Sequence, residues 1–322
     1  MENIVRLRYW WFALSLLVIV PGAIFLALYG LRPSIDFSGG ALWDIQFLER
    51  TRAELNTEEI ARVFAEHGFE GALVQLSTVT LPDGKTVPSA LVRTKSLSAA
   101  NPEEQVQQVL AALQANYGQV RRESLQSVGP TVSRESTRSA VIAVLGACVA
   151  ILIYLTLAFR RAPHPFRYGV CAILAMLHDV LVVIGMAAIL GHFIGLEVDA
   201  LFLTALLTVI SFSVHDTIVV FDRIRENLIA RRAGETFDEI VNHSIVQTLP
   251  RSINTQLTSL FTLTALLLFG GESIRHFVLI LLIGLISGTY SSLFNAAQLL
   301  VVWENREWQR WLRRGGDLPA TA

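Results

Sequence analysis

Residues 201–221 read LFLTALLTVISFSVHDTIVVF, an almost uninterrupted apolar run that indicates the class of fold. Its length matches the roughly 20 residues with which one helix crosses a membrane. The run carries one carboxylate, Asp216, at a depth where an ionised group costs roughly 2.5–3.5 kcal/mol. Such a residue is rarely tolerated without a function, most often the transport of protons or ions. The stretch therefore predicts a membrane span that contains a transport residue.

The composition of the whole chain also indicates a membrane protein. Of its 322 residues, 52% are hydrophobic and only 16% are charged, whereas about 25% are charged in an average soluble domain. The formal net charge of −1 gives no reason to expect a nucleic-acid partner. Cys148 and Cys171 both lie in apolar runs, which favours packing over a disulfide, and the spacing of a metal site is not found. We therefore expect neither a metal nor an organic cofactor.

Six apolar segments are long enough to cross a membrane. They are residues 9–30, 139–159, 166–191, 201–221, 252–269 and 277–303. The first is too long for a signal-peptide core and is not followed by a small-residue cleavage pattern, so we expect it to be retained. The predicted fold class is a polytopic α-helical membrane protein of about six transmembrane helices. The expected domains are residues 1–30 (N-terminus and first span), 31–138 (extracytoplasmic), 139–303 (five-helix bundle) and 304–322 (C-terminal tail).

The basic residues predict the orientation of these spans. In a six-span chain, the basic residues near the ends of the spans gather on one side of the membrane. They are Arg6, Arg8, Arg160, Arg161, Arg167, Arg223, Arg225, Arg231, Arg232, Arg306, Arg310, Arg313 and Arg314. In the opposite short loops, residues 191–200 and 270–276, the only Lys or Arg is Arg275. Because cytoplasmic loops carry an excess of Lys and Arg, both termini are predicted to be cytoplasmic.

The polar segment 31–138 lies between the first and second spans and reads as an independent domain. Strands are predicted over 40–48, 72–79, 86–94 and 119–128, and amphipathic helices over 56–68 and 102–117. An Asp83-Gly84 turn joins the second and third strands. The order βαββαβ is that of the ferredoxin-like fold.

Three further ionisable residues fall within or beside the predicted spans. Asp179 lies near the middle of the third span, His215 precedes Asp216 in the fourth, and Arg251 lies at the cytoplasmic end of the fifth, just before residue 252, at a depth comparable with that of Asp216. All four are candidates for proton coupling. A static Asp216–Arg251 ion pair, a purely structural pair of His178 with Asp179, and a packing role for His215 remain open alternatives.

The sixth span carries small residues on one helical stripe. Gly284, Gly288 and Ser291 share this stripe, and the GxxxG spacing of the two glycines permits close approach of another helix. We expect the three residues to serve helix packing.

Taken together, several motifs resemble the SecD/SecF family of the bacterial protein translocase, at its SecF half. They are SIDFSGGALW (34–43), SVGPTVSRES (127–136), LHDVLVVIG (177–185), SFSVHDTIVVFDRIREN (211–227), LFGG (268–271) and GLISGTYSS (284–292). They occur in the family's order and cover nearly the whole chain. The architecture of six spans and one outer domain also resembles half of a resistance-nodulation-division transporter.

The resemblance implies a function that composition does not. SecF acts with SecD to drive late steps of preprotein export with the proton gradient, at the SecYEG translocon in the bacterial inner membrane. The implied partners are SecD, SecYEG, the unfolded preprotein and membrane lipid, and protons are the coupling ion. The family's transport-linked Asp and Arg fall on Asp216 and Arg251. The implied protein is not an enzyme.

Three other classes of function fit the sequence less well. Half of a small-molecule or lipid exporter has the same architecture, although such exporters join two halves with larger outer domains. An intramembrane enzyme is disfavoured, because the GLISG sequence at 284–288 does not have the GxSxG spacing and HExxH is missing. A translocon scaffold that moves no protons is disfavoured by the charges within the spans.

Overall fold

The structure, a computed structural model, describes residues 4–81, 84–97, 101–160, 164–307 and 309. It divides into two compact units. One is Pro33–Val141, and the other combines Met1–Arg32 with Ile142–Ala322. The chain enters the smaller unit after its first membrane helix and leaves it within α5 (Pro130–Ala158).

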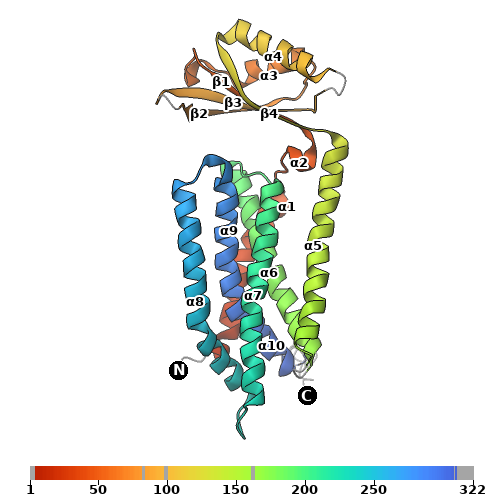
Figure 1. The fold of residues 1–322 in the computed structure, drawn as a ribbon, viewed down its shortest axis with the longest axis vertical. Coiled ribbons are helices and arrows are strands. Elements are labelled where there is room, and N and C mark those ends of the chain that lie inside the picture. Colours follow the sequence, from red (N-terminus) through yellow and green to blue (C-terminus); the bar gives the residue numbers. More distant parts are fainter. Residues whose placement is uncertain (1–3, 82–83, 98–100, 161–163, 308, 310–322) are drawn as a thin grey trace, which may run out of the picture. The chain divides into compact units, whose positions relative to one another are not determined.

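The smaller unit is a four-stranded antiparallel sheet with two helices on one face (Figure 1). Its elements are α2 (Ile35–Ser38), β1 (Gly40–Phe47), the 3-10 turn η2 (Arg52–Glu54), α3 (Thr57–Glu66), β2 (Leu73–Thr80), β3 (Thr86–Thr94), α4 (Pro102–Tyr117) and β4 (Val120–Val128). The strand order is β2-β3-β1-β4, with β1 paired to both β3 and β4. The predicted βαββαβ, ferredoxin-like fold is confirmed.

Local signals account for where these elements begin and end. The Asn56 side chain accepts a hydrogen bond from the backbone N–H of Glu58 and caps α3. Pro102 begins α4, and Gly118 ends it with a positive φ of 80°. The predicted turn between β2 and β3 includes Asp83, which lies outside the described residues. Alternate residues of β1 enter the core, where the Trp43 ring meets Phe64 edge-on at 5.2 Å.

The larger unit is a helical bundle, and its described residues form six helices that are long and apolar enough to span a membrane. Its elements are η1 (Ile4–Leu7), α1 (Arg8–Tyr29), α5, α6 (Pro165–Ile194), α7 (Ala200–Ile229), α8 (Phe237–Phe269), α9 (Glu272–Ser291), a π-helical turn η3 (Ser292–Ala296) and α10 (Ala297–Glu304). The last three form one continuous span. The chain is therefore a multi-pass membrane protein.

Two helices begin well before their predicted spans. The fifth span was expected at residue 252, but α8 begins at Phe237 under a capping box of Thr236 and Glu239, and Pro250 lies inside it. The second was expected at 139, but α5 begins at Pro130. Hydropathy marks the part of a helix that suits lipid, whereas backbone hydrogen bonding continues the helix through the polar residues beyond that part.

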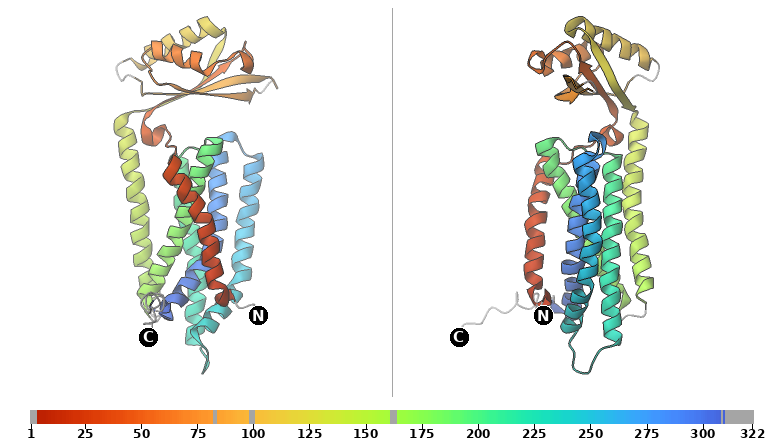
Figure 2. Two further views of the ribbon diagram at one scale, coloured as in Figure 1. Left: turned by 180° about the vertical axis from the view of Figure 1, so that it is seen from behind. Right: turned by 60° about the vertical axis from the view of Figure 1, so that its left-hand side comes forward.

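The bundle is densest around α6, α7 and α9, whereas α5 and α8 are largely exposed. α1 packs along α6 (Figure 2), and Gly22 and Gly185 make this close approach possible. A Cβ atom on Gly22 would lie 2.8 Å from the Cα atom of Gly185, closer than any side chain permits. Neither glycine was expected from the sequence to serve packing.

Candidate functional site

Asp179 of α6 is a carboxylate that is 0% exposed and has several hydrogen-bond partners. Its Oδ2 atom accepts hydrogen bonds from Ser213 Oγ at 2.5 Å and Ser291 Oγ at 2.6 Å. Its Oδ1 atom accepts one from Ser287 Oγ at 2.6 Å and lies 3.0 Å from His178 Nδ1. Hydrogen bonds of this number stabilise a buried carboxylate without any counter-charge.

The serines reach Asp179 because three helices meet there. Ser213 lies on α7, and Ser287 and Ser291 lie one turn apart on α9. Gly288 of α9 faces Ser213, where an added Cβ would stand 3.3 Å from the serine Cβ. The small residue therefore brings α9 close enough for its serines to share one carboxylate with Ser213.

The small-residue stripe of the sixth span thus lies at the contact of α9 with α7. A Cβ on Gly284 would stand 2.1 Å from a methyl carbon of Val209, so α7 occupies the space that a side chain would need. Ser291, expected to serve packing alone, also donates to Asp179. The stripe therefore combines close helix approach with hydrogen bonding.

His178 joins Asp179 within one helix rather than between helices. Its Nδ1 atom faces Asp179, and its Nε2 atom is buried without a hydrogen-bond partner among the described residues. The His178 ring lies 6.0 Å from the ring of Tyr290 on α9. The histidine therefore adds a fourth contact to the Asp179 cluster.

Asp216 of α7 is held quite differently. It is 4% exposed, and among the described residues its one side-chain hydrogen bond comes from Gln256 Nε2 on α8. Gln256 is 8% exposed, and its Oε1 atom is buried without a partner in the described structure. The Asp216 site is therefore a carboxylate and an amide that leave part of their hydrogen-bonding capacity unused.

Arg251 and His215, the other expected coupling residues, are not joined to Asp216. Both are exposed in the bundle, and no ion pair or hydrogen bond links either to Asp216 among the described residues. Arg251 lies five residues before Gln256 on α8, a rise of about 7.5 Å along the helix. Gln256, and not Arg251, is therefore the residue of α8 that lies level with Asp216.

Ser213, Ser287 and Gln256 were not singled out from the sequence. A signal for Gln256 was nevertheless present, because Asp216 directly follows the polar, exposed His215 and Gln256 directly follows the polar, exposed Thr255. A one-residue step turns a side chain by about 100° around a helix. His215 and Thr255 lie on the outer surface of the bundle, and the residue that follows each of them turns inward.

One end of the bundle is joined by ion pairs. The Arg8 guanidinium contacts Glu307 at 2.5 Å and Asp238 at 3.2 Å, and Arg167 pairs with Glu304. Burial alone would raise the pKa of the Glu307 carboxyl, but hydrogen bonds from Tyr9 and Arg8 and the charge of Arg8 outweigh it, so this pKa is lowered. These contacts bring the ends of α1, α6, α8 and α10 together, as the grouping of basic residues predicts.

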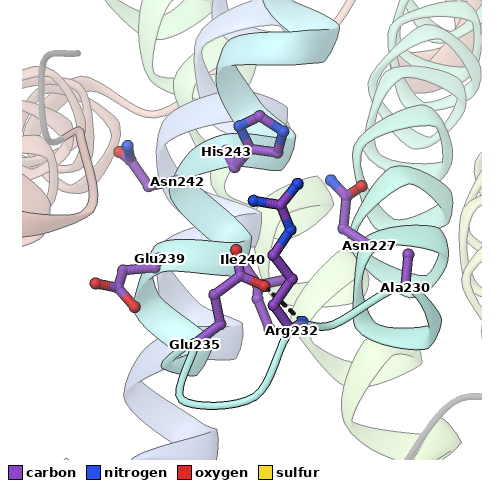
Figure 3. Close-up of a pocket in the computed structure, with 8 residues that line it drawn as sticks. All are labelled: Asn227, Ala230, Arg232, Glu235, Glu239, Ile240, Asn242 and His243. Atoms are coloured by element: carbon purple, nitrogen blue, oxygen red, sulfur yellow. Dashed lines mark hydrogen bonds between the residues drawn. The ribbon is translucent and has the colours of Figure 1, made fainter.

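A polar pocket of about 440 Å³ lies at the turn between α7 and α8 (Figure 3). Figure 3 shows the Arg232 side chain rising between Asn227 and His243. Glu235 Oε2 accepts a hydrogen bond from the Arg232 backbone N–H at 3.0 Å, and Glu239 caps α8. These acids therefore serve the turn itself. No group of three metal-ligating side chains occurs within the described residues.

Comparison with known proteins places this geometry in a family. The model of the family "Protein export membrane protein SecD/SecF, C-terminal" matches residues 108–306. A protein translocase subunit SecF from Thermobaculum terrenum is 51% identical over 98% of both chains. The chain belongs to the SecF family. A second SecF, from Anaerolinea thermophila, is 46% identical over the full length of both chains.

Solved structures agree with this assignment. The crystal structure of SecDF from Thermus thermophilus, described as a translocon-associated membrane protein, superposes with a TM-score of 0.75 at 34% identity. The match covers 95% of this chain but 39% of that one, so the SecF family fold is there part of a longer chain. The resemblance seen in the sequence is confirmed. The expectation that the protein is not an enzyme is likewise confirmed, because its relatives are translocase subunits.

Proposed function

We propose that this protein is a proton-driven subunit of the Sec translocase that works with SecD in late steps of preprotein export. The observation that carries the proposal is Asp216, a carboxylate buried inside a membrane-spanning helix with one hydrogen-bond donor. A buried carboxylate with few donors, and with no ion pair among the described residues, can take up and release a proton at little structural expense. Protons are accordingly the coupling ion, and no organic cofactor is required.

The exposed polar residues of two spans support a SecD partner. Thr204 and His215 on α7 and Arg251 and Thr255 on α8 lie at the surface of the bundle. Charged and polar side chains within spans almost always face protein or water rather than lipid. A second membrane half would cover them, in keeping with the longer SecDF chains among the relatives. We extend this partnership to SecYEG and to the unfolded preprotein.

We place the protein in the bacterial inner membrane with both termini in the cytoplasm. The end of the bundle that carries Arg8, Arg167 and the α7–α8 turn is the basic one. Cysteine labelling tests this placement in a variant that lacks Cys148 and Cys171. With an impermeant reagent, Glu66→Cys on α3 should react in intact cells and Arg232→Cys should react only after lysis. The reverse pattern contradicts the orientation.

The decisive experiment separates a proton-driven subunit from a scaffold. Gradient-dependent completion of preprotein export is measured in vesicles, together with the amount of intact complex. Asp216→Asn should lower export at least tenfold with normal assembly, because Asn keeps the shape and a hydrogen-bond acceptor but cannot exchange a proton. Asp222→Asn is the matched control, since Asp222 lies farther along α7 and pairs with Arg225 at 2.8 Å. Full export by Asp216→Asn would contradict the proton-driven role and favour a scaffold that moves no protons.

A further inference from the structure

The amide of Gln256 is the immediate partner of the proposed proton-carrying group. Gln256 Nε2 donates to Asp216 Oδ2 across the contact of α8 with α7. The Oε1 atom of the same amide is buried and has no partner within the described residues. The large majority of buried side-chain polar atoms have a hydrogen-bond partner, so the unused acceptor beside a titratable group calls for an explanation.

A primary amide can serve both protonation states of a carboxyl group. An ionised Asp accepts hydrogen bonds only, and the Gln N–H groups supply them. A protonated Asp has an O–H to donate, and the Gln carbonyl oxygen can accept it. A Leu or Met at the same place could do neither, and a Lys or Arg could match only the ionised state.

We propose that Gln256 is a positioning residue for proton transfer, which binds Asp216 through Nε2 when it is ionised and through Oε1 when it is protonated. The carboxyl group then keeps a hydrogen-bond partner on α8 throughout the cycle. No bond other than that to the proton forms or breaks, since the proton enters and leaves Asp216 and Gln256 only exchanges its role. This inference rests on the proposed function and adds the residue that makes both states of Asp216 stable.

The surroundings of Asp216 leave this role to Gln256. On α7 itself, His215 faces outward, and on α8 Arg251 is exposed without an ion pair in the described structure. On α6, Asp179 and His178 bond to each other, and Asp179 also binds Ser213. On α9, the Tyr290 hydroxyl donates to the Trp11 backbone oxygen at 2.5 Å.

The side of Gln256 away from Asp216 is apolar. Gln256 lines a groove of about 410 Å³ between α8 and α9, together with Leu257, Leu285 and Leu293. Water in such a groove would find few polar partners. The amide therefore stands between the carboxyl group and an apolar region, and it is the group that meets the hydrogen-bonding needs of Asp216 from that direction.

The test uses the full chain in its SecD complex and compares Gln256→Met with Gln298→Met. Met matches the length and flexibility of Gln without its polar atoms. Gln298 on α10 is a matched control, because it is fully buried and its amide atoms have no partners among the described residues. Infrared difference spectra across pH report the carboxylic-acid C=O band, and its disappearance in Asp216→Asn assigns it to Asp216.

Gln256→Met should move this C=O band to higher frequency, because the acid loses its hydrogen-bond acceptor. The midpoint of band formation, and the pH profile of export, should move to higher pH by about one unit, since the hydrogen bond that the ionised form loses is stronger than the one that the protonated form loses. Gln298→Met should leave both unchanged. If Gln256→Met is not recovered as a complex, Gln256→Glu decides, and it should shift the midpoint upward because a second carboxylate disfavours ionisation.

An unchanged band and midpoint in the Gln256 variant overturn the proposal, even where Asp216→Asn abolishes export. Failure of the proposed function looks different: export survives in Asp216→Asn, while the band and its dependence on Gln256 can still be measured. The two ideas can therefore fail separately.

Discussion

Asp179 and Asp216 are buried carboxylates on neighbouring helices of one bundle, yet their surroundings differ in kind. Asp179 receives hydrogen bonds from three serines and faces His178, so four groups from three helices hold it. Within the described part of the chain, Asp216 receives one, from an amide whose own oxygen has no partner there. Burial alone therefore does not distinguish the two carboxylates, whereas the number of hydrogen-bond donors around each of them does.

The physical reason lies in what each carboxylate would lose by taking up a proton. A protonated Asp179 would leave some of its donors without an acceptor, and buried polar groups without partners cost about 1–3 kcal/mol each. A protonated Asp216 gives up one hydrogen bond and can gain another. We infer that Asp179 fixes the packing of α6, α7 and α9, and that Asp216 is the group whose state changes.

The largest expected effect is on the stability of the Asp179 cluster. Asp179→Ala should lower the free energy of unfolding by about 3–5 kcal/mol, since it leaves three buried hydroxyls without their acceptor. Asp216→Asn should lower it by less than about 1 kcal/mol, because it disturbs a single hydrogen bond. Denaturant unfolding of the purified chain in detergent measures both. Equal losses in the two variants would break the distinction.

The next largest effect on the free energy of unfolding should come from changes that disturb the close approach of α9 to α7 at Gly284. Gly284→Ala places a Cβ where Val209 stands, which should cost about 1–3 kcal/mol through overpacking. Gly284→Ala with Val209→Ala should recover much of that loss, because the second change makes room for the first. The same unfolding measurement applies, and an additive loss in the double variant would contradict a direct contact. Gly288→Leu should also weaken the Asp179 cluster by displacing Ser213.

Single serines should sharpen the comparison further. Ser291→Ala should lower the free energy of unfolding by about 1–2 kcal/mol, because it removes one donor from a buried carboxylate. Ser211→Ala on the exposed side of α7 is the control and should stay within about 0.5 kcal/mol of the parent chain. Neither change should alter the pH profile of export. A shifted profile in Ser291→Ala would draw Asp179 into proton coupling.

The smallest expected effect belongs to a third carboxylate, Glu307, which lies beyond the membrane span. Its lowered folded-state pKa means that the unfolded chain binds the proton more tightly, so its stabilisation is present at neutral pH. That stabilisation is lost as pH falls below about 4, the range of an ordinary Glu and lower. Glu307→Gln should remove about 1 kcal/mol at neutral pH and little at pH 3, as measured by unfolding at both values. The exposed Glu226, paired with Arg223 at 2.9 Å, is the control, and Glu226→Gln should change little at either pH.

Much of the fold could be predicted from local patterns in the sequence. Apolar length marked the six spans, and strand alternation with helix caps such as Asn56 marked the elements of the smaller unit. Hydropathy could not place the ends of α5 and α8, because those helices continue into polar residues. Asp216 could be singled out because its depth depends only on distance along one helix.

The hydrogen-bond partners of Asp216 and Asp179 depend on tertiary structure. Ser213 and Ser291 are 34 and 112 positions from Asp179, and Gln256 is 40 from Asp216. Their meeting depends on the rotation of each helix about its axis and on close approach at Gly288, neither of which hydropathy records. Sequence reasoning therefore assigned Arg251 to the depth that Gln256 occupies. The apolar length of each segment predicts which groups enter the membrane, and packing between helices fixes which of them touch, because side-chain contacts across helices are not a property of any one segment.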